Sequence, residues 1–305
     1  MGDRLFKKLD DPDSLRRSPI FVFAADPQAS GGLLCLGETA GRARTRPEFL
    51  ALLRQFIDDA VIDGLLLTPA DAALLAVEER LFDDSPVTPL VRMNAETGIW
   101  NPRSGRYRES PSLPFSTVTI EDAASGGAVR LGLYSITLNN RADSDEVVLS
   151  AYLRFARAVG ERPDFDHVLE VFLPNLPQPG LDPEAQGQFV ADSIGRLMSY
   201  LLPHQRPRFL KTAYTTPAIW ESLTRFDSTL IVGALGGPRR DARTTLHLAH
   251  DVITHGGRAI LFGRAIFEEQ SPRQIARALR AVLDGRMTPD DAYSAYQRAT
   301  EDEPV

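Results

Sequence analysis

Short apolar runs alternate with amphipathic stretches along almost the whole chain. Each run is rich in Val, Ile, Leu or Phe, which is typical of strands buried on both faces. The stretches between them carry apolar residues at helical spacing, and some open with a cap such as Thr45-Arg-Pro-Glu48. The pattern predicts eight strands, at Ile20–Ala24, Val61–Leu67, Val87–Met93, Val129–Ile136, Val168–Leu173, Arg208–Ala213, Thr229–Gly233 and Arg258–Phe262.

Helices are expected between these strands. After the helix that Thr45 caps, the predicted ones begin at Thr68 and Thr288 or cover Ser144–Val159, Pro183–Leu201, Asp241–Thr254 and Ser271–Leu283. Strands that alternate regularly with helices predict an α/β fold, and we favour a (β/α)8 TIM barrel. The competing doubly wound sheet usually has a glycine fingerprint after its first strand, and the turn at 25–32 contains neither GxGxxG nor a Walker loop.

The domain organisation follows from the absence of any linker with a shift in composition. We therefore expect a single barrel domain over residues 1–305. The stretch 94–114 is long for a loop between a strand and a helix, so we expect it to overhang the barrel mouth or a subunit contact. Residues 286–305 are expected to form a C-terminal helix and tail.

Composition and charge narrow the class of protein. The chain has 305 residues, of which 43% are hydrophobic and 25% are charged, as in ordinary soluble proteins. A net charge of −7 argues against nucleic acid as a partner. No apolar run reaches the roughly 18 residues of a membrane span, and the charged start has no signal-peptide segment. The one cysteine, Cys35, excludes an intrachain disulfide. We expect a cytoplasmic protein.

Lysine is scarce, and one lysine lies in an apolar run. Of 34 basic residues, only Lys7, Lys8 and Lys211 are lysines. Phe209, Lys211 and Ala213 fall on one face of a predicted strand, because side chains alternate. A lysine that points into a barrel is desolvated, which disfavours its charged form, and a neutral amine can form a Schiff base with a carbonyl. The alternative is a lysine whose ammonium reaches solvent or an ion pair.

Two strands near the C-terminal end run into glycine and arginine. TIM barrels often bind phosphate on the loops after strands seven and eight, through backbone N–H groups. Gly236, Gly237 and Gly263 would let the backbone approach an anion, and Arg264 would add a charged pair of donors. The alternative is a pair of ordinary turns beside a surface arginine.

Two carboxylates also lie at predicted strand ends. Asp26 follows the first strand, and Glu170 lies in an otherwise apolar run. A carboxylate in such a place is either paired or used in chemistry, because burying it alone is costly. Both could move protons beside an imine. The alternative is an ion pair with an arginine such as Arg92 or Arg208.

A metal site is not expected. His247, His250 and Asp251 fall on one helical face at a spacing that metal ligands use. That helix should belong to the outer layer of the barrel, away from the strand ends where TIM barrels carry their sites. We therefore expect neither a metal nor another cofactor.

These residues together show a resemblance to a known family. The sequence resembles the class I, Schiff-base aldolases of the DeoC/LacD superfamily, which are TIM barrels. Phe23–Asp26, followed by Gln28 and Gly31, is similar to the first-strand aspartate motif of the tagatose-bisphosphate and sulfofructose-phosphate aldolases. Leu210–Thr215 is similar to the sixth-strand lysine motif of the archaeal-type fructose-bisphosphate aldolases.

The most specific part of the resemblance is Leu230–Pro272, which is similar to the phosphate-binding end of the family. Glu170 resembles the fifth-strand glutamate of the tagatose-bisphosphate branch. The chain departs from the family in having Leu173 where the archaeal-type branch carries a tyrosine, and Pro27 after the aspartate. The loop 94–114 is a further departure.

The resemblance implies a metal-independent lyase that makes or breaks a carbon–carbon bond next to the ketone of a phosphorylated or otherwise anionic ketose. It implies imine formation at Lys211, with Glu170 and Asp26 handling protons and substrate hydroxyls. The substrate-binding residues that we expect are Gly236, Gly237, Gly263, Arg264, Gln28 and Arg92. Barrels of this family often associate, so we also expect a homo-oligomer.

Two other functions stay open at this point. The same imine could serve a transferase or condensing reaction, or the barrel could bind a sugar phosphate without catalysis.

Overall fold

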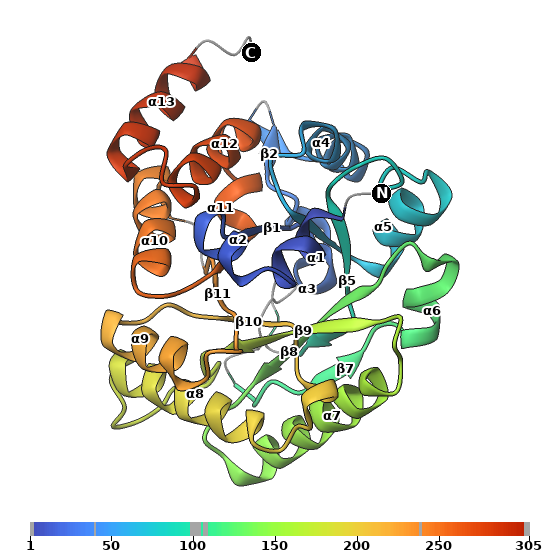
Figure 1. The fold of residues 1–305 in the computed structure, drawn as a ribbon, viewed down its shortest axis with the longest axis vertical. Coiled ribbons are helices and arrows are strands. Elements are labelled where there is room, and N and C mark those ends of the chain that lie inside the picture. Colours follow the sequence, from blue (N-terminus) through green and yellow to red (C-terminus); the bar gives the residue numbers. More distant parts are fainter. Residues whose placement is uncertain (1–2, 40, 98–104, 106–108, 238–239, 302–305) are drawn as a thin grey trace.

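A computed structural model describes residues 3–39, 41–97, 105, 109–237 and 240–301. Eight parallel strands close into a barrel in the order β1-β12-β11-β10-β9-β8-β5-β4 (Figure 1), which confirms the predicted TIM barrel. The barrel strands are β1 (Ile20–Ala24), β4 (Gly64–Leu67), β5 (Thr88–Arg92), β8 (Leu131–Thr137), β9 (Asp166–Phe172), β10 (Phe209–Thr212), β11 (Val232–Leu235) and β12 (Ala259–Phe262).

Helices surround the barrel and cover one of its ends. They are α1 (Arg4–Leu9), α2 (Pro12–Arg17), α3 (Gln28–Gly31), α4 (Arg46–Asp59), α5 (Pro69–Ala72), α6 (Ile120–Ala124), α7 (Ala142–Gly160), α8 (Pro183–Met198), α9 (Pro217–Phe226), α10 (Ala242–Thr254), α11 (Arg264–Phe267), α12 (Pro272–Leu283) and α13 (Pro289–Glu301). Short 3₁₀ or π-helical turns lie at Gly32–Leu34, Ala73–Glu78, Ser125–Gly127 and Pro203–Gln205.

Helix α4 shows how the local sequence starts these helices. The Thr45 hydroxyl accepts from the backbone N–H of Glu48, and the Glu48 carboxylate accepts from the Thr45 N–H at 2.8 Å, so the predicted capping box is confirmed. Such a box satisfies N–H groups that the first turn leaves unpaired. Phe49, Leu53 and Phe56 then fall on one face and are fully buried against the barrel.

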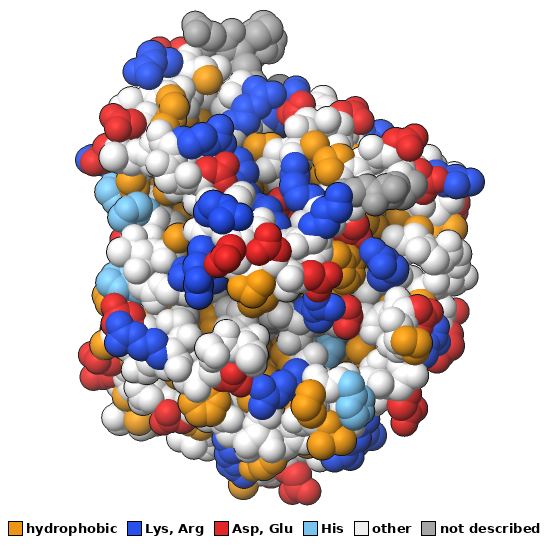
Figure 2. Space-filling view, in the orientation of Figure 1, with side chains coloured by type: hydrophobic (Ala, Val, Ile, Leu, Met, Phe, Trp, Pro, Cys, Tyr) orange, Lys and Arg blue, Asp and Glu red, His pale blue; other side chains and the backbone are white. Residues whose placement is uncertain are grey.

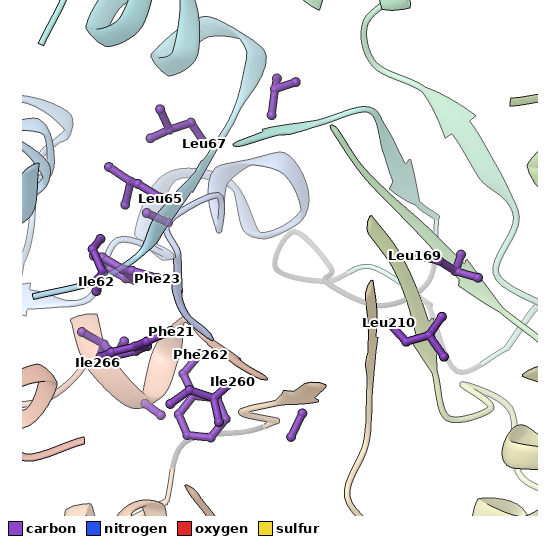
Figure 3. Packing of buried hydrophobic residues seen from close by; sticks show 14 of the residues in the cluster. Phe21, Phe23, Ile62, Leu65, Leu67, Leu169, Leu210, Ile260, Phe262 and Ile266 are labelled. Carbon is purple, nitrogen blue, oxygen red and sulfur yellow. The ribbon is translucent and has the colours of Figure 1, made fainter. Parts of the chain in front are cut away.

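Strand residues alternate between two apolar layers. Inward-pointing side chains fill the barrel, whereas outward-pointing ones pack beneath the helices. Phe21, Phe262 and Ile266 of the outer layer gather beside one another (Figure 3). Phe209 on β10 belongs to the inner layer and Leu210 to the outer one. The direction of every inward side chain is therefore set by its place in the strand.

Helices α1 and α2 close the N-terminal end of the barrel, which the sequence pattern did not predict. Leu5, Leu9 and Leu15 pack on the inward-pointing residues of the strands. Lys and Arg side chains intermingle with Asp and Glu on this face (Figure 2). Under it, the buried carboxylate of Asp63 accepts from Arg4 Nε at 2.7 Å and from Lys8 Nζ at 2.8 Å. The C-terminal end of the barrel is therefore the one that these two helices leave uncovered.

Strand β11 begins three residues later than predicted. The expected start, Thr229, lies in a turn, where its N–H and hydroxyl both donate to Asp227 Oδ1, at 2.9 and 2.7 Å. The N–H of Leu230 donates to the Asp227 carbonyl at 3.0 Å. Because these groups are used in the turn, the strand pairs only from Val232 onward.

The long loop at 94–114 is organised at both ends. Its first residues form β6 (Asn94–Glu96), which pairs antiparallel with β7 (Pro114–Ser116). A second antiparallel pair joins β2 (Glu38–Thr39) to β3 (Arg42–Ala43). Residues 98–104 and 106–108 of the loop, and 302–305 of the predicted tail, lie outside the described residues.

Candidate active site

A layer of polar side chains lies inside the barrel near the C-terminal ends of its strands. Lys211 on β10 pairs in register with Glu170 on β9, and Glu170 pairs with Ser135 on β8. Thr212, the next residue along β10, points outward and donates its hydroxyl to the Val171 carbonyl at 2.9 Å. The inward direction predicted for Lys211 is therefore confirmed. Its register partner on β9 is Glu170, whereas its partner on β11 is Gly233.

Glu170 is the centre of this layer. Its Oε1 lies 2.6 Å from Lys211 Nζ, and its Oε2 accepts from the Ser135 hydroxyl at 2.7 Å and from Arg92 Nη2 at 3.2 Å. Burial raises the pKa of this carboxyl, but the charges of Lys211 and Arg92 outweigh burial and hold the pKa below its usual value. Glu170 is therefore a carboxylate at neutral pH.

Arg92 joins the two predicted carboxylates. Its Nε donates to Asp26, its Nη1 donates to Ser135 Oγ at 2.6 Å, and its Nη2 reaches Glu170. Burial opposes the charge of the guanidinium, but Asp26 and Glu170 raise its pKa above the usual value. Arg92 is therefore an internal counter-ion, as the ion-pair alternative required. Arg208, the other candidate partner, instead contacts Asp166 at 3.1 Å.

Ser135 and Asn94 are two members of the layer that sequence reasoning missed. Asn94 Nδ2 donates to the Ser135 carbonyl at 2.8 Å, and Asn94 Oδ1 accepts from the Ser135 N–H at 2.7 Å. Both side chains are fully buried or nearly so. The clamp fixes the backbone from which the Ser135 hydroxyl reaches Glu170. A polar residue inside an apolar run was the available signal for Ser135 on β8, as it was for Glu170 on β9.

This layer forms the floor of a cavity of about 460 Å³. Eight of the residues predicted to act on substrate line it, among them Lys211, Glu170, Asp26 and Arg92. Gln28 on α3 is not among the described lining residues. The full lining is Ala24, Asp26, Pro27, Arg92, Glu170, Phe172, Leu173, Pro174, Asn175, Leu176, Pro177, Lys211, Ala213, Leu235, Gly236, Gly237, Leu261, Gly263, Arg264 and Phe267.

The predicted anion end forms one side of the cavity. Gly237 has φ +68°, which favours glycine, and a Cβ on Gly263 would lie 2.7 Å from the Ala24 carbonyl oxygen. Both glycines, with Gly236 and Arg264, line the same space as Lys211. Pro238, also part of the predicted motif, lies outside the described residues.

Glu96 is a buried carboxyl that the sequence analysis did not single out. It is 4% exposed, and neither of its oxygens makes a hydrogen bond with a described residue. Burial raises its pKa to about 8, although the nearby hydroxyls of Thr137 and Ser112 and the charge of Arg92 oppose the rise. Arg92, Asn94 and Glu96 are spaced two residues apart, so in an extended segment their side chains point to the same side. This spacing was the signal that could have identified Glu96.

The outer-layer histidines do not assemble into a metal centre in the described part of the chain. His247 is 46% exposed on α10 and lies 3.2 Å from Asp290. Across the described ranges, no group of three or more His, Cys, Asp or Glu side chains has the arrangement of a metal site.

Known structures share this architecture. No protein-family model matches the sequence, and no curated protein matches it. A fructose-bisphosphate aldolase from Slackia heliotrinireducens matches with a TM-score of 0.70 at 16% identity, covering 99% of this chain and 91% of that one. An archaeal fructose-1,6-bisphosphate aldolase, whose catalytic lysine is bound to a carbinolamine intermediate, matches at 0.65 and 19% identity, covering 88% and 96%.

A Schiff-base-forming fructose-1,6-bisphosphate aldolase gives a TM-score of 0.66 at 20% identity, covering 88% of this chain and 95% of that one. The chain has the fold of these aldolases. The resemblance drawn from the sequence is thereby confirmed for the fold. Within the described residues, none of the helices combines the length and the hydrophobicity that crossing a membrane requires.

Proposed function

We propose that this protein is a metal-independent class I aldolase in which Lys211 forms a Schiff base with an anionic ketose. The observation that carries the proposal is the placement of Lys211. Its Nζ lies on the floor of the cavity, 2.6 Å from the carboxylate of Glu170, at the end of the barrel that α1 and α2 leave open. A buried amine beside a buried carboxylate, at the floor of a cavity, is an arrangement that imine chemistry uses.

The proposed reaction needs one amine and one group that accepts and returns protons. Lys211 Nζ first gives a proton to Glu170, and the neutral amine then adds to the ketone carbon. Loss of water from the adduct leaves a protonated imine. The bond between the α and β carbons then breaks. Its electron pair moves into the imine to form an enamine, while the β-hydroxyl loses its proton and becomes the carbonyl of the released aldehyde. Protonation of the enamine and hydrolysis return the amine. Glu170 is at hydrogen-bond distance from Nζ and would move these protons.

The other residues would hold the substrate and the relay in place. Asp26 lines the cavity and is anchored by Arg92, so its carboxylate can accept hydrogen bonds from substrate hydroxyls. Arg92 and Ser135 would keep Glu170 ionised and oriented. We assign the anion to the end formed by Gly236, Gly237, Gly263 and Arg264, and keep Gln28 as a proposed contact near the mouth.

Borohydride trapping tests the proposal directly. The protein is incubated with a panel of ketose phosphates and sodium borohydride, and the adduct is located by peptide mass spectrometry. With only three lysines in the chain, the assignment is simple. We expect an adduct on Lys211, its loss in Lys211→Met, and a fall in turnover of roughly 10³-fold or more.

Lys8→Met is the matched control, because Lys8 also pairs with a buried carboxylate but at the closed end. Folded Lys8→Met protein should be trapped as the unchanged protein is. Undiminished turnover in Lys211→Met would refute the assignment. Stabilisation by a ketose phosphate with no adduct would favour a barrel that binds without catalysis.

A further inference from the structure

The strand order divides the cavity into two sides. Lys211 lies on β10, with β9 as its neighbour on one side and β11, followed by β12, on the other. The segment Phe172–Pro177, which begins with the last residue of β9, therefore forms one wall of the cavity. The glycines after β11 and β12 belong to the opposite side. A substrate whose carbonyl meets Lys211 would extend toward both.

The wall after β9 is almost entirely apolar. Six consecutive residues of this segment line the cavity, and Asn175 is the sole polar one among them. Its Oδ1 accepts from Asn139 Nδ2 at 2.9 Å and from the Ser112 N–H at 3.0 Å, while its Nδ2 donates to the Ser110 carbonyl at 3.0 Å. The amide of Asn175 is thus used to tie loops together. The apolar members of the wall are Phe172, Leu173, Pro174, Leu176 and Pro177.

Further hydrogen bonds to Asn139 hold the wall in place. Asn139 Oδ1 accepts from the Leu176 N–H at 3.0 Å, and the Asn139 carbonyl accepts from Gln178 Nε2 at 3.1 Å. Two prolines restrict the backbone of the segment further. The wall is therefore a preformed hydrocarbon surface, which favours binding because little conformational freedom is lost when a ligand packs on it.

Such a surface discriminates against charge. A phosphate placed against it would lose water without gaining hydrogen bonds, and this desolvation is costly. An apolar group placed there instead gains from leaving water. The opposite side carries Arg264 and the close backbone approach at Gly263, which suit an anion.

We propose that the aldehyde half of the substrate is uncharged and apolar and packs against Phe172–Pro177, while the ketone half carries the anion toward Gly236, Gly263 and Arg264. This inference rests on the proposed Schiff-base function and specifies its substrate. In the synthetic direction, the enamine carbon on Lys211 attacks the aldehyde carbon, and the aldehyde oxygen takes up the proton that the relay returns. The product is a ketose-like aldol with one charged end and one apolar end.

The test compares two aldehydes with one donor. Dihydroxyacetone phosphate is the donor, and pentanal or glyceraldehyde 3-phosphate is the acceptor, with products quantified by mass spectrometry. We expect kcat/KM for pentanal to exceed that for glyceraldehyde 3-phosphate by roughly tenfold or more. Leu173→Arg should reverse the preference. Leu202→Arg, at a leucine that is 56% exposed away from the cavity lining, should not.

Borohydride trapping of the donor alone separates the two levels of the proposal. If the donor is trapped on Lys211 but the phosphorylated aldehyde is preferred, the inference about the acceptor is overturned and the aldolase proposal stands. If the donor is not trapped, both fall. If Leu173→Arg does not fold, the preference of the unchanged protein between the two aldehydes still decides whether the acceptor is apolar.

Discussion

The two ends of the barrel interior each hold a buried lysine paired with a carboxylate, in different surroundings. At the N-terminal end, Lys8 Nζ lies 2.8 Å from Asp63 and also donates to Ser18 Oγ at 3.0 Å and to the Pro19 carbonyl at 3.3 Å. At the C-terminal end, Lys211 Nζ lies 2.6 Å from Glu170 and faces the cavity. The two lysine side chains are almost equally buried, at 7% and 6% exposed.

The difference is what else the ammonium meets. All three N–H groups of Lys8 are used within the protein, under a cap of two helices, and Asp63 also accepts from the Phe21 N–H and from Arg280. Burial lowers the pKa of Lys8, with Asp63 opposing the shift. A buried lysine–carboxylate pair is therefore a structural device at one end of this barrel. Only the cavity makes the same pair a candidate site at the other end.

The largest expected contrast comes from removing the charge of each carboxylate. Asp63→Asn leaves Arg4, Lys8 and Arg280 facing an amide in a closed place, so we expect the free energy of unfolding to fall by about 3–5 kcal/mol. Glu170→Gln leaves Arg92 still paired with Asp26, and it leaves the ammonium of Lys211 at the cavity. We therefore expect the free energy of unfolding to fall by about 1–2 kcal/mol. Urea unfolding measures both. Equal losses would contradict the distinction between a closed and an open end.

Glu96 sharpens the comparison through pH. Its pKa of about 8 lies above that of a glutamate in the unfolded chain, so folding favours the protonated form. Stability contributed by that protonated carboxyl is present below about pH 4.5 and is lost as the pH rises toward 8. Glu96→Gln, which stays neutral, should match the unchanged protein near pH 4 and exceed it by roughly 3–5 kcal/mol above pH 8.

Unfolding curves at pH 4, 7 and 9 provide the measurement. The control is Glu146→Gln at an exposed position of α7, which should change stability little at each pH. The charges that face Glu96 are those of Arg92, which favours its ionised form, and Glu170, which opposes it. A stability gain in Glu96→Gln that is independent of pH would rule out the titration of this carboxyl as the cause.

The smallest expected effects come from two serines with equivalent bonding. Ser18 accepts from Lys8 and donates to Asp284 Oδ1 at 2.9 Å, whereas Ser135 accepts from Arg92 and donates to Glu170. Each change to alanine should cost about 1–2 kcal/mol of stability. Only Ser135→Ala should slow adduct formation with a ketose phosphate, by about tenfold, because its hydroxyl orients Glu170, the proposed proton relay. A similar slowing in Ser18→Ala would show that trapping simply follows stability.

The scarcity of lysine does not by itself distinguish a candidate catalytic lysine from a structural one. It drew attention to Lys211, but Lys8 is one of the same three lysines and takes part in the packing of the closed end. Alternation along β10 was the better guide, because it gave the direction of the Lys211 side chain. The two N-terminal helices went unpredicted because their few apolar positions, such as Leu5 and Leu9, have meaning only against the barrel end that they cover.

The sequence by itself determined the strands, the capped helices and the side of β10 on which Lys211 lies, because these depend on neighbours within a few residues. Only the tertiary structure decided that Arg92 connects Asp26 with Glu170, since these partners are 66 and 78 positions away from it in the chain. It also decided which of two similar ion pairs opens to a cavity. Closing the barrel at one end and leaving it open at the other is a property of packing, which no local pattern encodes.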